Sequence, residues 1–96
     1  MGLELVELVM DCEDEFGISI PDAAVSDVRT VGEFFDIVLT LIRSTGKPEL
    51  RHRPDLEEYA WDRVCSICGR LFLRMIQKDV TVITRSTRFI EDLGSG

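Results

Sequence analysis

Apolar residues recur along this chain at intervals of three and four, the spacing that is typical of helices with one buried face. The pattern predicts substantial helices over residues 3–16, 31–43 and 55–77, and a short helix within residues 22–28. In the first of these segments the apolar residues, most of which share one broad face, are Leu5, Val6, Leu8, Val9, Met10, Cys12 and Phe16. The chain is therefore predicted to fold as an all-α bundle.

Start and stop signals support these boundaries. Gly17 follows the first helical segment, where a glycine just past the helix is a common stop. Pro21 disfavours a helical conformation at the residue before it, so residues 18–20 should be extended. Thr30 precedes the next long helical segment, and Glu33 follows three residues later, which is the spacing of a capping box.

Two connecting segments complete the pattern. Residues 44–54 form a polar stretch with two prolines and one glycine, which predicts a flexible linker. Residues 78–94 follow the last helix as a largely irregular loop that carries apolar side chains. The predicted core includes Leu5, Val9, Ile20, Phe34, Val38, Ile67, Leu71, Phe89 and Leu93.

The chain is acidic, and its negative charge is concentrated in one half. Residues 1–43 hold ten acidic residues against Arg29 and Arg43, a net charge of −8. Residues 44–96 hold eight acidic and nine basic residues, a net charge of +1. Nucleic acids and anionic membranes are therefore poor partners, and a basic partner protein is expected to dock on the first half.

No apolar run approaches the roughly 20 residues that span a bilayer, so no membrane span is predicted. The start of the chain is acidic rather than basic, unlike a secretory signal. A cytoplasmic protein is the resulting expectation.

The chain has three cysteines, an odd and sparse count that does not build a disulfide framework. Cys65 and Cys68 have the CxxC spacing of some redox and zinc sites, but only Cys12 and His52 remain as further zinc ligands. Cys68 lies on the apolar stripe of its helix with Cys65 beside it. We therefore expect buried, inert thiols and no metal site, and we expect no general base at His52 in the linker.

The first half of the chain resembles part of the acyl carrier protein family. Residues 3–16, LELVELVMDCEDEF, are similar to the second helix of that family, with the central Val-Glu-Leu-Val at 6–9 and the acidic end with Phe at 13–16. The segment GISIPD at 17–22 is also typical. So is Arg-Thr-Val-Gly-Glu at 29–33, which leads into the last helix of the family.

The second half resembles the part of the family that ordinarily comes first. Residues 61–77 are similar to the opening helix, and TVITRSTRFIEDLG at 81–94 is similar to the loop that leads to the pantetheine site. The resemblance thus implies a single domain over residues 1–96, a four-helix bundle in circularly permuted order. Residues 1–43 are equivalent to helices II–IV, residues 44–54 are the linker, and residues 55–94 are equivalent to helix I and its following loop.

Circular permutation is plausible because the last helix of the family ends near the start of the first, within reach of a flexible linker. A second interpretation is that the chain spans the end of one carrier domain and the start of the next in a tandem array. Either interpretation allows a monomer or a domain-swapped dimer.

The residue that carries the cofactor in this family is absent at the matching position. Family members attach 4′-phosphopantetheine to a serine at the start of the second helix, and the alignment places Gly2 there. Glycine has no hydroxyl group, so no phosphodiester can form at this position. The fallback is Ser95, which would lie just before the family position if the two ends of the chain meet. We therefore expect no bound cofactor.

Acidic residues recur along the first helix, and the resemblance implies a role for them. Family members present an acidic second helix to basic patches on their enzymes, and the matching residues here are Glu4, Glu7, Asp11 and Asp14. A solvated helix face is an equally good interpretation of this stripe from the residues alone.

Two functions follow from the sequence. The first is a non-enzymatic, carrier-like module that docks acidic helix II on a basic partner, such as an enzyme of fatty-acid or polyketide synthesis. The alternative is a working acyl carrier of those pathways, with phosphopantetheine on Ser95 or on a native serine that was lost at the boundary of this sequence.

Overall fold

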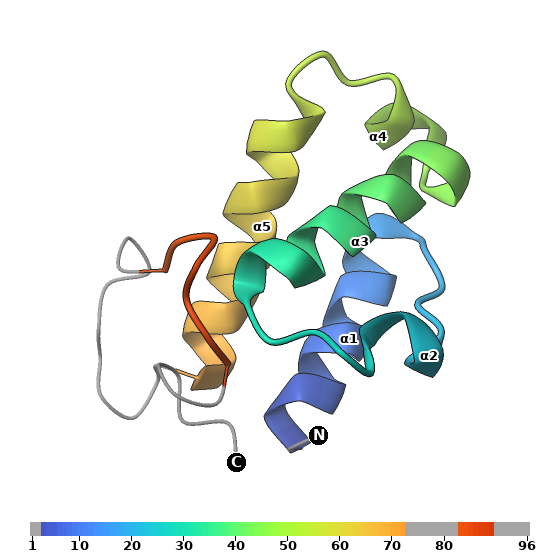
Figure 1. Cartoon of the computed structure of the whole chain (residues 1–96). Helices are drawn as coiled ribbons and strands as arrows, with labels where there is room; N and C mark the ends of the chain where they lie inside the picture. The colour runs from blue at the N-terminus through green and yellow to red at the C-terminus, as the bar shows by residue number, and fades with distance from the viewer. Residues whose placement is uncertain (1–2, 73–82, 90–96) are drawn as a thin grey trace.

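The computed structural model describes residues 3–72 and 83–89. Within these ranges the chain is mostly helical and holds no strand, so the all-α prediction is confirmed. The helices are α1 (Leu3–Phe16), α2 (Asp22–Val25), α3 (Val31–Thr45), α4 (Pro48–Arg51) and α5 (Leu56–Phe72). Helix α5 packs against both α1 and α3, whereas the single-turn helices α2 and α4 contact α3 (Figure 1).

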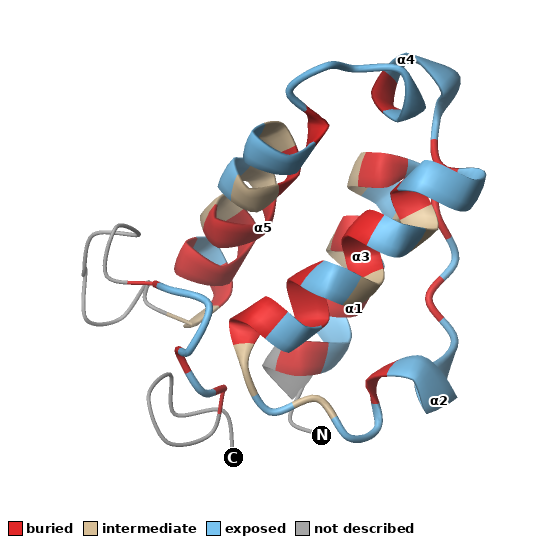
Figure 2. Ribbon diagram, turned by 45° about the horizontal axis from the view of Figure 1, so that its top comes forward, coloured by how far each residue is buried: buried red, intermediate tan, exposed pale blue. Residues whose placement is uncertain are grey.

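The core lies where the three long helices face one another (Figure 2). Eight of the nine predicted core residues are buried, and the ninth, Leu93, lies outside the described residues. Aromatic rings extend the core to the segment 83–89. The ring of Phe89 contacts that of Phe34 edge-on at 6.2 Å and that of Phe72 at 5.8 Å between centroids. Burying such rings contributes more than burying small side chains, because more apolar surface leaves the water.

The predicted signals at the start of the chain act as expected. Gly17 ends α1 with a φ of 64°, a conformation that costs glycine little. The segment between α1 and α2 is extended up to Pro21. The carboxylate of Glu13 accepts a hydrogen bond of 2.7 Å from the backbone N–H of Ile20, which ties this segment back onto α1.

The start of α3 is closed by its own residues and by the segment 83–89. The capping box is present: Thr30 and Glu33 each accept a backbone hydrogen bond from the other. The next two N–H groups, those of Val31 and Gly32, donate to the carbonyls of Thr87 and Arg85, both at 2.9 Å. All four N–H groups that a helix start leaves without a partner are thus satisfied.

The polar segment 44–54 is more ordered than predicted, so the expectation of a flexible linker is wrong in part. Helix α3 continues to Thr45, and the hydroxyls of Ser44 and Thr45 donate to carbonyls one turn earlier in the same helix. Pro48 then opens α4, since proline fits the first turn of a helix. Leu50, an isolated apolar residue in this segment, is buried against the core and holds the turn in place.

Helix α5 begins at Leu56, one residue later than predicted. The remainder of the predicted helix, residues 73–77, lies outside the described residues, as does most of the predicted loop. Within that loop Ile83 and Phe89 are buried as expected, and Arg88 forms an isolated antiparallel bridge with Thr30.

Candidate docking surface on α1

One side of α1 is buried against the rest of the protein and the other side is open to solvent. Leu8, Cys12 and Phe16 have no exposed surface, and they recur at the four-residue spacing of a single helix face. Acidic residues occupy most of the remaining positions, so the outer side of α1 is the strongest candidate for a functional surface in the acidic half of the chain.

The structure divides the four predicted docking residues into three groups. Glu7 and Asp14 are exposed, and neither forms an ion pair with another described residue. Asp11 is only half-exposed, and its carboxylate accepts a hydrogen bond of 2.8 Å from Arg70 of α5. The side chain of Glu4 lies outside what the structure describes. Two of the predicted residues are therefore available to a partner as they stand, and Asp11 is already engaged.

Two further acidic residues of α1 hold the fold together rather than facing a partner. Glu13 binds the extended segment as described above, and Glu15 accepts a hydrogen bond of 3.1 Å from Arg63 of α5. The Glu15 carboxylate raises the pKa of Arg63, because hydrogen bonding and charge both favour the protonated guanidinium. With Arg70, Arg63 forms a row of basic groups on α5 that joins it to α1.

Sequence reasoning missed two exposed apolar residues on this surface. Val6 and Met10 were grouped with the apolar face of the first helix, yet 40% and 57% of their surfaces are exposed. They follow one another at a spacing of four, and Asp14 continues the same row. Their angular position around the helix axis differs from that of Leu5 and Leu8 and could have identified them as exposed. They stand among many apolar residues in this segment, however, and were therefore grouped with the buried face.

Val6 and Met10 line a small groove between α1 and the start of α2. Its volume is about 150 Å³, and the remaining lining residues are Val9, Glu13, Ile20 and Asp22. An exposed methionine beside a groove suits a binding surface, because its unbranched side chain adapts to different contacts. The open side of α1 thus combines apolar contact area with exposed carboxylates.

The three cysteines are buried and free, as predicted. Burial raises the pKa of Cys12 to about 12 and that of Cys65 to about 11, with smaller contributions from nearby carboxylates. Burial likewise raises the pKa of Cys68. Thiolates are the reactive and metal-binding form, so these positions do not suit either chemistry. Among residues 3–72 and 83–89 no group of histidine, cysteine and acidic side chains is arranged to hold a metal ion.

The two positions that bear on cofactor attachment, Gly2 and Ser95, both lie outside the described residues. His52 is exposed at the end of α4. None of the helices in the described part of the chain has the length and apolar character needed to cross a bilayer.

Comparisons with protein-family models and with solved structures add nothing to this picture. No protein-family model matches the sequence, and no solved structure matches the chain. The resemblance to acyl carrier proteins therefore stays a prediction that rests on the motifs of the sequence.

Proposed function

We propose that this protein is a non-enzymatic, carrier-like docking module that binds a basic partner protein through the outer face of α1. The observation that carries the proposal is the composition of that face. Glu7 and Asp14 are exposed carboxylates that pair with no described residue, and they lie beside Val6 and Met10, two apolar side chains that are exposed to water. A surface of this kind supplies both electrostatic steering and apolar contact area.

The order of the helices fits the proposed permutation. Helix α1 corresponds to helix II of the carrier fold, α2 to helix III, α3 to helix IV and α5 to helix I. Helix α4 has no counterpart in this scheme and belongs to the connection that would join the former ends. The partner in this proposal is an enzyme of fatty-acid or polyketide synthesis, and Gly2 leaves the chain without an attachment point for the pantetheine arm.

A titration with a broad-specificity phosphopantetheinyl transferase tests both parts of the proposal, because such an enzyme acts on carrier proteins. Amide chemical shifts of the ¹⁵N-labelled chain should move along α1 as the transferase is added, and the movement should diminish at high salt because exposed charges are screened. After addition of coenzyme A, the intact mass of the chain should not change.

The matched variants are Glu7→Lys and Glu49→Lys, which reverse an exposed carboxylate on α1 and on α4 respectively. We expect the first to weaken the interaction about tenfold and the second to change it less than about twofold. Equal effects of the two variants would refute the α1 surface. A mass gain of one phosphopantetheine on Ser95 would instead establish a working carrier.

A further inference from the structure

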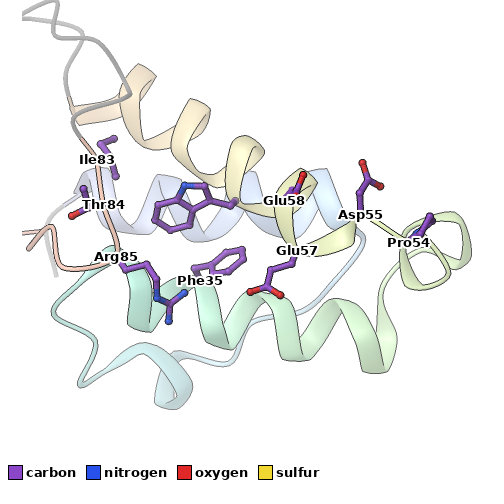
Figure 3. A pocket seen from close by; sticks show the side chains of 9 residues that line it. Phe35, Pro54, Asp55, Glu57, Glu58, Ile83, Thr84 and Arg85 are labelled. Carbon is purple, nitrogen blue, oxygen red and sulfur yellow. The ribbon is translucent and has the colours of Figure 1, made fainter.

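A larger cleft lies away from the α1 surface, and nothing in the proposed function uses it. Its volume is about 730 Å³, within the range of typical ligand pockets. The cleft opens between the first turns of α5, the second turn of α3 and residues 83–85 (Figure 3). No residue of α1 lines it.

Two aromatic side chains give this cleft an apolar floor. Phe35 of α3 and Trp61 of α5 contact each other edge-on, with ring centroids 5.2 Å apart and an angle of 82° between the planes. Phe35 is fully buried, whereas Trp61 is half-buried and so keeps part of its ring accessible. The face of such a ring attracts cations, and tryptophan does so most strongly.

The charged groups around the floor leave an excess of carboxylate. Arg85 is held by Asp36, with its Nη2 atom 2.8 and 2.7 Å from the two carboxylate oxygens. Asp55 is held by Arg53, whose Nε and Nη2 atoms each donate to a different oxygen of the carboxylate. Glu57 and Glu58 remain, and both are exposed without an ion pair to any residue in the described ranges.

Arg85 illustrates how a guanidinium group is accommodated here. Its Cζ atom lies 5.8 Å from the centroid of the Phe35 ring while its nitrogen binds the Asp36 carboxylate. Figure 3 shows Arg85 and Glu57 on either side of Phe35. Trp61 follows Glu57 and Glu58 on α5 at spacings of four and three residues, which place side chains next to one another on a helix surface, and all three line the cleft.

We propose that this cleft binds an arginine side chain of a partner protein, which stacks on Trp61 and pairs with Glu57 and Glu58. Arginine fits better than lysine because its planar guanidinium both stacks on a ring and forms two parallel bonds to a carboxylate. An anionic ligand is disfavoured because Arg85, the one basic residue among the described residues of the lining, is already neutralised by Asp36. The cleft is thus a second docking site, independent of α1.

Trp61 is the only tryptophan of the chain, so its fluorescence reports directly on the cleft. The intact protein is titrated at fixed ionic strength with the peptide acetyl-Gly-Arg-Gly-amide and with matched peptides that carry lysine or citrulline in its place. We expect saturable binding of the arginine peptide with a Kd of about 1–10 mM. The lysine peptide should bind at least about threefold more weakly, and the uncharged citrulline peptide at least about tenfold.

Variants separate this cleft from the α1 surface. The double variant Glu57→Gln, Glu58→Gln should weaken binding of the arginine peptide at least about fivefold, whereas Glu7→Gln, Asp14→Gln should leave it unchanged. All four positions are exposed, and circular dichroism verifies that each variant is folded. The proposal is overturned by an absence of saturable change, by equal binding of the arginine and lysine peptides, or by an unchanged Kd in the Glu57, Glu58 variant.

Discussion

Gly32 occupies a position where the close approach of two backbone segments leaves no room for a side chain. A Cβ atom at this residue would lie 2.6 Å from the carbonyl oxygen of Arg85, the same oxygen that accepts the hydrogen bond from the Gly32 N–H group. The nearest atoms are the carbonyl oxygen, Cα and Cβ of Arg85, whose positions are set by the backbone and which cannot rotate away as the end of a side chain can. The contact between α3 and this segment therefore requires glycine.

Replacing Gly32 by alanine should destabilise the protein by about 1–3 kcal/mol, because overpacking outweighs the better helix propensity of alanine. Urea unfolding measures the loss, and amide shifts of residues 83–89 should move with it. Thr40→Ala on the exposed side of the same helix serves as the control and should stay within about 0.5 kcal/mol of the original protein. A Gly32→Ala variant as stable as the original would contradict the proposed close contact.

At the scale of the helices, the ion pairs between α1 and α5 connect the stability of the bundle with the proposed docking surface. Asp11–Arg70 is largely exposed, with side-chain exposures of 37% and 65%, so its contribution to stability should be small. Its effect on the charge of α1 is larger, because Arg70 neutralises one of the carboxylates that a basic partner would meet.

Replacing Arg70 by alanine should therefore strengthen binding to the phosphopantetheinyl transferase about two- to threefold, while unfolding free energy falls by no more than about 1 kcal/mol. Arg51→Ala removes an exposed cation from α4 and is the matched control for net charge. The same chemical-shift titration measures both variants. If Arg51→Ala strengthened binding equally, overall charge rather than the freed Asp11 carboxylate would be the cause.

Over the whole molecule, titratable groups define a range of pH in which the fold is most stable. Hydrogen bonds from the backbone N–H groups of Arg29 and Thr30 lower the pKa of Glu33 below its ordinary value of 4.5. A hydrogen bond from Arg53 lowers the pKa of Asp55 below 3.8. Both carboxylates therefore stabilise the fold above their ordinary pKa values, and this stabilisation is lost as the pH falls through their lowered values.

The buried cysteines affect the stability of the fold at alkaline pH. Burial raises the pKa of Cys12 from 9.0 to about 12 and that of Cys65 from 9.0 to about 11, so the folded state keeps thiols protonated that the unfolded state would ionise. The contribution of these buried thiols to the free energy of unfolding is therefore fully present below pH 9 and declines as the pH rises above 9.

The urea midpoint should accordingly be highest between about pH 5 and pH 9 and should fall on both sides. Glu33→Gln should flatten the acid side of this profile without altering the alkaline side. Denaturation curves across the pH range, followed by circular dichroism, provide the measurement. An acid limb that is identical with and without the Glu33 carboxylate would show that the capping box contributes nothing to the pH dependence.

The sequence by itself determined α1, α2, α3 and the described part of α5, though not α4, because helix periodicity, Gly17 and the Thr30–Glu33 capping box are local signals that act over a few residues. It also determined most of the core, because apolar residues that recur with the helix period lie on one face of each helix, and that face packs against the other helices. Burial of the three cysteines followed from the same pattern.

Tertiary structure alone decided how the remaining side chains are used. Whether an acidic residue of α1 is free or engaged depends on which groups of α5 lie across from it, and this sets Asp11 apart from Glu7. The burial of Leu50 and the cleft at Trp61 likewise arise from segments distant in sequence. Contacts of this kind depend on the packing of the whole chain, which local spacing does not specify.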